Sequence, residues 1–344
     1  MDPAPCGERP FRLHKGRSHK NRCGRTDRTG DEPWAPKAGW KIRGGSGLRR
    51  TAPAQPGKMK KMDKPCLITG ELVNTFLQKR ERQLHKGNCG TVFELAGSHG
   101  MAGAAVLCGR GALRSGAGLL RICIPEPLFP VIHGSLPEAT CVPRFKDAEG
   151  LDLTRCQAAA IGPGLGAEKE NVGMIKRILR QLDGTAVLDA DALNLLAGDK
   201  TLIEGRRAEL IITPHPGEAG RLLGCGAAEI NGDRTGCARR LAEQYGAVAV
   251  LKGAGTIVAT PGGETYINTT GNPGMATGGS GDVLTGIISS LAGQGLAPLA
   301  AALAGVYIHG SAGDIGAEKL GEYGLMASDI AQFTGIAIAR IAGA

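Results

Sequence analysis

The chain has 344 residues, of which 42% are hydrophobic and 21% charged, and its formal net charge is +9 at neutral pH. The positive charge is concentrated at one end: residues 1–62 hold 16 Lys and Arg against 5 Asp and Glu, whereas residues 63–344 hold 25 against 27. The second part is nearly neutral, which argues against a basic nucleic-acid-binding surface there. The sequence also has no apolar stretch of membrane-spanning length.

Residues 1–62 are rich in Pro, Gly, Lys and Arg and have no sustained apolar periodicity. We expect them to be a disordered basic extension, or to reflect a start assigned too far upstream, with Met59 or Met62 as the true first residue. Residues 63–344 would then form one domain. The ten cysteines contain no Cys-x-x-Cys pair and the histidines do not cluster with them, so we predict no metal site and reduced thiols in a cytoplasmic protein.

Along residues 63–344, short aliphatic or β-branched runs alternate with helical patterns. The runs predict strands at residues 119–124, 158–161, 186–188, 210–212 and 247–251, with helices between them. This order predicts right-handed βαβ units, and hence an α/β fold of three layers with a mostly parallel central sheet between helices. Two Ala-rich segments, 298–315 and 325–341, predict closely packed helices, to which we assign no chemistry.

The most informative stretch is the glycine-rich run at residues 272–282, which ends where an amphipathic helical pattern begins. We expect residues 278–281 to form a tight loop at a helix N-terminus, where backbone N–H groups and the helix dipole favour a phosphate. Asp282 would face the reacting centre and be held ionised by the same N–H groups. The alternative is that Asp282 only caps the helix.

Two other segments place polar groups at strand ends. Lys252 begins the turn 252–256, which follows one apolar run and precedes another, and such a glycine turn can lie against a nucleotide. Lys252 either reaches a phosphate or belongs to a solvated strand end. His215 follows another buried strand, where it either contacts a ligand or packs structurally, and Glu218 begins the next helix. The carboxyl ends of parallel strands meet in one crevice, where open α/β sheets bind ligands.

Together with five further segments in the same order, these three resemble the ADP/ATP-dependent NAD(P)H-hydrate dehydratase family of the ribokinase-like superfamily. The resemblance runs from about His85 to the end of the chain. The further segments are HKGNCG (85–90), AGSHGMAGAA (96–105), RSGAGL (114–119), IGPGLG (161–166) and LDADALN (188–194).

The resemblance implies a ribokinase-like fold and ADP-dependent dehydration of the S-epimer of hydrated NADH or NADPH, giving NAD(P)H, AMP and phosphate. It implies Mg²⁺ with ADP, or ATP, as phosphoryl donor, and Asp282 as the catalytic base. It implies a homo-oligomer such as a tetramer. The near-neutral charge of residues 63–344 and the lack of a membrane-spanning stretch predict no nucleic-acid or membrane partner. The implied contacts are Ala104, Gly164, His215 and Asp282 for the hydrated dinucleotide, and Lys252, Gly253, Ala254, Gly255, Thr256 and Gly281 for the adenine nucleotide.

Other interpretations remain open. A vitamin or sugar kinase of the same superfamily, such as a hydroxymethylpyrimidine or hydroxyethylthiazole kinase, would share the phosphate loop and the base, although segments 96–105 and 213–218 look like the dehydratase versions. A Rossmann dehydrogenase fits poorly, because the third glycine of segment 162–166 comes one position too early. Ala104 and Gly164 could also be small residues where chain segments approach closely.

Overall fold

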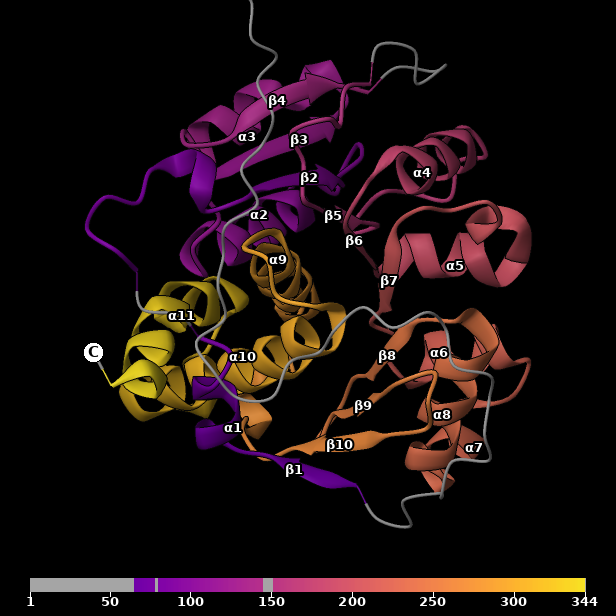
Figure 1. Ribbon diagram of the computed structural model, residues 1–344, viewed down its shortest axis with the longest axis vertical. Coiled ribbons are helices and arrows are strands. Elements are labelled where there is room, and N and C mark those ends of the chain that lie inside the picture. The colour runs from indigo at the N-terminus through magenta and orange to yellow at the C-terminus, as the bar shows by residue number, and fades with distance from the viewer. Residues whose placement is uncertain (1–64, 78–79, 145–150, 344) are drawn as a thin grey trace, which may run out of the picture. The chain divides into compact units, whose positions relative to one another are not determined.

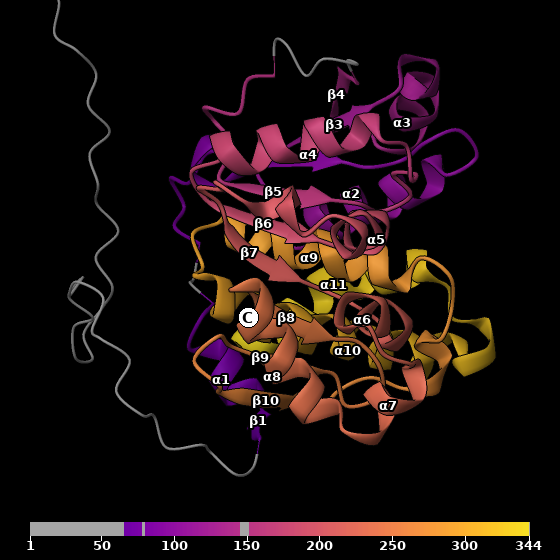
Figure 2. The same cartoon turned by 90° about the vertical axis from the view of Figure 1, so that its right-hand side faces the viewer.

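The computed structural model describes residues 65–77, 80–144 and 151–343 (Figures 1 and 2). The expectations for residues 1–62, including the start at Met59 or Met62, therefore lie outside the described residues. Everything that follows concerns the domain that begins at β1.

The strands form one sheet in the order β1-β10-β9-β8-β7-β6-β5-β2-β3-β4 (Figure 1). Among the described strands, β9 alone runs antiparallel to its neighbours, so the predicted mostly parallel sheet is confirmed. The bounds are β1 Cys66–Ile68, β2 Thr91–Leu95, β3 Leu119–Ile124, β4 Thr140–Pro143, β5 Ala158–Ile161, β6 Thr185–Leu188, β7 Glu209–Ile212, β8 Val248–Leu251, β9 Ile257–Ala259 and β10 Thr265–Asn268.

Helices cover both faces of this sheet, as the sequence predicts (Figures 1 and 2). On one face lie α1 Gly70–Asn74, α2 Ala102–Arg114, α3 Phe129–Ser135, α9 Ser280–Gly293, α10 Pro298–Leu320 and α11 Ala327–Ala342. On the other lie α4 Glu170–Gln181, α5 Ala190–Gly198, α6 Pro216–Leu223, α7 Ala227–Gly232 and α8 Arg234–Tyr245. Within the described part of the chain, no helix is both long and apolar enough to cross a membrane.

The central strands form because each is a short apolar run that can be buried on both faces. In β6, Ala186 and Leu188 face the α4–α8 layer, whereas Val187 faces α9 and α10. Such near-continuous apolar runs are typical of parallel strands covered by helices on both sides. The predicted strands 119–124 and 158–161 match β3 and β5, and the other three differ by one residue at their first position.

Helix α9 lies at the centre of its layer, with twelve of its fourteen residues buried. It packs tightly on α2, because a Cβ at Gly286 would overlap the backbone oxygen of Cys108 and a Cβ at Gly111 would overlap that of Val283. These glycines let the two helix backbones approach. The packing fixes the N-terminus of α9 at the edge of the sheet where the parallel strands end.

Candidate active site

A cavity of about 850 Å³ lies at the carboxyl ends of the central strands. Its walls come from the segments that follow β6, β7, β8 and β10, and from the first turns of α9. The lining includes His215, the turn 252–256, Gly281 and Asp282, which the sequence predicts to bind ligands. The crevice therefore brings together segments that are far apart in the sequence.

The glycine loop opens onto α9 as predicted. The helix begins at Ser280, and its N-cap is Gly279, whose φ of +89° lies in the left-handed region. A side chain there would also meet Leu107 of α2, so glycine suits both the backbone conformation and the packing. Asp282 lies inside the first turn and is not the N-cap, which excludes the simple capping role.

The structure corrects the expectation that backbone N–H groups hold Asp282 ionised. Burial, followed by the charge of the nearby Asp189 carboxylate, raises the pKa of Asp282 to about 7, and the Lys252 ammonium opposes this shift. A carboxyl group that titrates near neutral pH can accept and release a proton during turnover. The raised pKa therefore suits a general base better than a permanently ionised carboxylate would.

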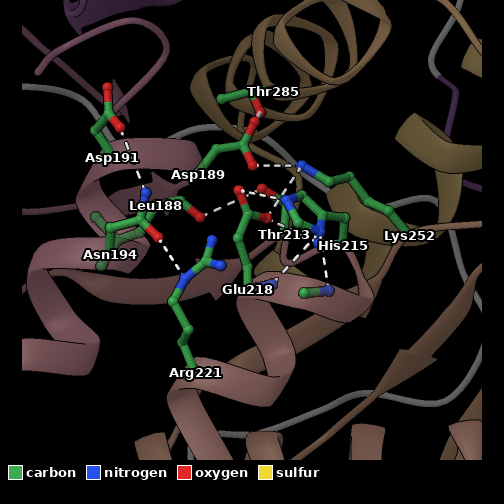
Figure 3. A network of polar contacts seen from close by, with 11 residues as sticks. Leu188, Asp189, Asp191, Asn194, Thr213, His215, Glu218, Arg221, Lys252 and Thr285 are labelled. Carbon is green, nitrogen blue, oxygen red and sulfur yellow. Dashed lines mark hydrogen bonds and ion pairs between the residues drawn. The ribbon is translucent and has the colours of Figure 1, made fainter. Parts of the chain in front are cut away.

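A buried network joins the ends of β6, β7 and β8 (Figure 3). Lys252 Nζ lies 2.6 Å from Asp189 Oδ1 and 3.8 Å from Glu218 Oε2, and Thr285 of α9 donates to Asp189 Oδ2 at 2.8 Å. Burial disfavours the Lys252 ammonium, but the carboxylates of Asp189 and Glu218 outweigh it and raise its pKa. The Lys252 charge is thus paired at the base of the cavity, and the interpretation of a solvated strand end is wrong.

His215 is held by the helix that it precedes. Its Nδ1 accepts the backbone N–H of Gly217 at 3.0 Å, and its Nε2 lies 3.3 Å from Glu218 Oε1 (Figure 3). Glu218 in turn accepts the backbone N–H of His215 at 2.8 Å, completing a reciprocal cap at the start of α6. About half of the His215 side chain stays exposed, so the fixed ring still presents a surface to the cavity.

Ala104 and Gly164 lie next to each other, but neither is among the described residues that line this cavity. A Cβ at Gly164 would come within 2.8 Å of the Ala104 Cβ, and both positions are buried. Ala104 lies in the first turn of α2, after β2, and Gly164 follows β5, so both belong to the edge of the sheet that holds the cavity. Close chain approach is therefore observed here, and contact with a ligand stays a prediction.

Asp189 and His309 are among the cavity residues that the predicted site lacks. Asp189 follows the buried strand β6 directly, as His215 follows β7 within a few residues, and this position was a signal for it. His309 lies in α10, inside an Ala-rich helix with no motif that marks it in the sequence. Its Nε2 lies 2.9 Å from the backbone oxygen of Ser280.

The site offers little protein ligation for a metal ion. Among the described residues, no group of three or more His, Cys, Asp or Glu side chains is arranged to hold one. Mg²⁺ in nucleotide sites usually keeps several waters and is held by one or two carboxylates together with phosphates. The carboxylates at the cavity fit that arrangement, in which most ligands come from the nucleotide.

Comparisons with known proteins agree with this geometry. A model of the NAD(P)H-hydrate dehydratase family matches residues 92–334. The ADP-dependent (S)-NAD(P)H-hydrate dehydratase of Neisseria meningitidis serogroup B is 42% identical over 258 residues, covering 73% of this chain and 86% of that protein. The bifunctional NAD(P)H-hydrate repair enzyme Nnr of Moorella thermoacetica is 44% identical over 280 residues, covering 78% of this chain and 52% of that protein. The chain thus spans about half the length of this bifunctional relative.

A solved structure is similar along nearly its whole length. The ADP/ATP-dependent NAD(P)H-hydrate dehydratase of Bacillus subtilis, co-crystallised with ATP/Mg²⁺, superposes with a TM-score of 0.75 at 36% sequence identity, covering 81% of this chain and 99% of that one. The family match extends over well more than half of the chain and includes the glycine loop, Asp282 and the turn after β8. The chain belongs to the NAD(P)H-hydrate dehydratase family.

Proposed function

We propose that this protein dehydrates the S-epimer of hydrated NADH and NADPH at the expense of ADP, giving NAD(P)H, AMP and phosphate. The observation that carries this proposal is Asp282: a half-buried carboxyl group with a pKa raised to about 7, in the first turn of a helix that begins at a glycine loop and faces a cavity. Such a site combines a proton acceptor with backbone donors for phosphate.

The first step is a phosphoryl transfer. Asp282 accepts the proton of the ring hydroxyl as its oxygen attacks the β-phosphorus of ADP, and AMP leaves. The N–H groups at the start of α9 face the charge that develops on the transferring phosphoryl group. Removing one such donor in other enzymes costs roughly 3 kcal/mol of barrier, so the geometry of this turn matters.

The second step is an elimination. The hydroxyl has become a phosphate ester, which is a far better leaving group. The lone pair of the ring nitrogen expels phosphate, and the adjacent ring carbon then loses a proton, so the carbon–carbon double bond of the dihydronicotinamide is restored. The cavity walls from α10 and the segment after β10 help to exclude water from this centre.

The hydrated dinucleotide and the adenine nucleotide would bind at different parts of the same edge of the sheet. We assign Ala104, Gly164, His215 and Asp282 to the hydrated dinucleotide, and the turn 252–256 with Gly281 to the adenine nucleotide. The Ala104 and Gly164 contact follows β2 and β5, and the cavity follows the adjacent strands β6, β7 and β8. This run of neighbouring strand ends supports a substrate as long as a dinucleotide.

ADP is the donor that we favour, with ATP as the alternative. The name of the N. meningitidis relative specifies ADP, and the B. subtilis relative was co-crystallised with ATP/Mg²⁺. Mg²⁺ would neutralise the charge of the phosphates, and Glu218 is a carboxylate of the cavity that would help to hold it. A cytoplasmic location and assembly into a homo-oligomer such as a tetramer remain predictions.

A vitamin kinase with the same loop and base is the second candidate, because its phosphoryl transfer would need the same residues. The two functions are separated by offering the protein hydrated NADH or hydroxyethylthiazole, each with ADP or ATP and Mg²⁺, and following the products. We expect NADH, AMP and phosphate from the hydrate with ADP, and no phosphorylated thiazole. Phosphorylation of the thiazole alcohol without turnover of the hydrate would overturn the dehydratase assignment.

A further inference from the structure

Helix α10 contributes a side chain to the site that the sequence does not mark. His309 lines the cavity, and its Nε2 lies 2.9 Å from the backbone oxygen and 3.3 Å from the Oγ of Ser280, the first residue of α9. Ser280 is two residues before Asp282. The imidazole therefore bridges α10 to the turn that carries the proposed base.

The bond to Ser280 fixes the tautomer of this histidine. A carbonyl oxygen only accepts hydrogen bonds, so the proton of a neutral His309 ring must lie on Nε2. Burial, together with the charge of Lys252, lowers the pKa of His309 to about 4, and the Ser280 bond opposes this shift. The ring is therefore neutral at pH 7 and donates to Ser280 without gaining a charge.

Helix α10 also holds the segment after β10, which forms another wall of the cavity. Thr270 Oγ1 donates to the Tyr307 backbone oxygen at 3.0 Å, and Asp314 accepts from Gly271 N and Asn272 Nδ2, both at 2.9 Å. Successive turns of α10 thus bind the segment after β10 and the start of α9. Within this set, His309 makes the contact nearest to Asp282.

We propose that His309 is a positioning residue of the active site, whose Nε2–H holds the Ser280 carbonyl and so fixes the first turn of α9, where Gly281 N–H and the Asp282 carboxylate meet the cavity. The proposal rests on the proposed role of Asp282 in the dehydration. It assigns His309 no contact with the reacting atoms and no proton transfer.

The kinetic test compares His309→Leu, His309→Gln and the matched control His133→Leu, which replaces an exposed histidine of α3. Leu removes the donor, whereas a Gln amide can place an N–H near the position of Nε2. We expect kcat for the hydrate to fall at least about tenfold in His309→Leu and to return to within about threefold of wild type in His309→Gln. The Kd for ADP should change less than about threefold, because most of its proposed contacts lie in the turn 252–256.

Two kinetic outcomes would overturn the proposal: a wild-type kcat in His309→Leu, or an equal loss in His309→Leu and His309→Gln, which would indicate packing alone. A second measurement does not need turnover. The His309 signal in the imidazole ¹⁵N NMR spectrum of the wild-type protein at pH 7 is identified by its absence from the spectrum of His309→Leu. We expect that signal to be that of a neutral ring with its proton on Nε2. A protonated ring or an Nδ1–H tautomer would contradict the proposal even if the protein had a different activity. If the spectrum showed the neutral Nε2–H ring but the wild-type protein did not turn over the hydrate, the proposed function would be wrong and the hydrogen bond from His309 would stand.

Discussion

At the scale of single residues, the proposed chemistry depends on how buried charges act on one another. Asp189 is almost fully buried and lies between Lys252 and Thr285, and its charge raises the pKa of Asp282. If Asp282 is the base, activity must fall as the pH drops through its pKa, because the protonated carboxyl group cannot accept the substrate proton. Burial of Asp282 and the charge of Asp189 together therefore set the lower end of the active pH range.

Replacing Asp189 with Asn should shift the acidic limb of the pH profile of kcat/KM to lower pH. The substitution removes a negative charge beside Asp282 and leaves Lys252, whose charge lowers the pKa of Asp282, without that partner. Both effects favour the ionised base. The control is Asp183→Asn, which changes an exposed carboxylate. An unmoved or higher midpoint in Asp189→Asn would show that Asp189 does not tune the base.

Glu94 makes a second prediction at this scale. It is fully buried in β2, both its carboxyl oxygens lack an N–H or O–H partner among the described residues, and the Cys108 thiol lies beside it. Burial, followed by the charge of Asp282, raises its pKa well above the ordinary value. The unfolded chain therefore loses this proton at lower pH than the folded protein does, so the stability from Glu94 is lost as the pH rises towards the folded pKa.

Glu94→Gln should remove this loss. Between about pH 5 and the pKa of Glu94 in the folded protein, the free energy of unfolding of wild type should fall relative to that of the variant. The difference should grow by about 1.4 kcal/mol for each pH unit. Denaturant unfolding at several pH values measures the difference, with the exposed Glu243→Gln as control. If the two stability curves ran parallel over this range, Glu94 would titrate alike in the folded and unfolded chains.

At the scale of elements, the contact between α2 and α9 positions the base. Gly286 packs its backbone on Cys108, and a methyl group there would overlap the Cys108 oxygen. We expect Gly286→Ala to destabilise the protein by about 1–3 kcal/mol and to lower kcat, because α9 must move and Asp282 moves with it. Thermal unfolding and hydrate kinetics measure the two effects.

Gly173→Ala is the matched control, since Gly173 lies in α4, is exposed, and has open space at its Cβ position. It should stabilise the protein by about 0.5–1 kcal/mol, as Ala does in place of Gly in a helix, and leave kcat unchanged. Equal effects of the two substitutions would mean that the α2 and α9 contact does not depend on Gly286.

Several of the strands that the sequence predicts are uninterrupted buried apolar runs, such as β5 and β8. The sequence does not predict β2, where Glu94 interrupts the apolar residues, or β10, whose residues are partly polar and only partly buried. The glycines around Asp282 and Lys252 identify these two residues as candidate site residues in the sequence. The pairing of Lys252 with Asp189 could not be predicted, because it joins residues 63 positions apart through the sheet order. The raised pKa of Asp282 follows from its burial and from the charge of Asp189, and the Lys252 ammonium opposes it.

At the scale of the whole molecule, the sequence predicts that residues 1–62 add no core to the domain. Deleting them should change the free energy of unfolding by less than about 0.5 kcal/mol and leave kcat/KM for the hydrate unchanged. Both tryptophans, Trp34 and Trp40, lie in this segment, so unfolding is best followed by circular dichroism. A deletion that weakened folding or activity would assign the segment a role in the domain.

The proposed function depends on Asp282 acting as the base for a hydrated dinucleotide. The most direct measurement is the return of reduced-nicotinamide absorbance from hydrated NADH with ADP and Mg²⁺, made in parallel for wild type and Asp282→Asn, with ADP affinity measured separately. We predict turnover by wild type with one AMP and one phosphate for each NADH. For Asp282→Asn we predict less than about a tenth of the wild-type kcat, a barrier increase of more than about 1.4 kcal/mol, with a nearly unchanged Kd for ADP. A variant that kept wild-type kcat, or a wild-type protein that left the hydrate untouched, would contradict the account.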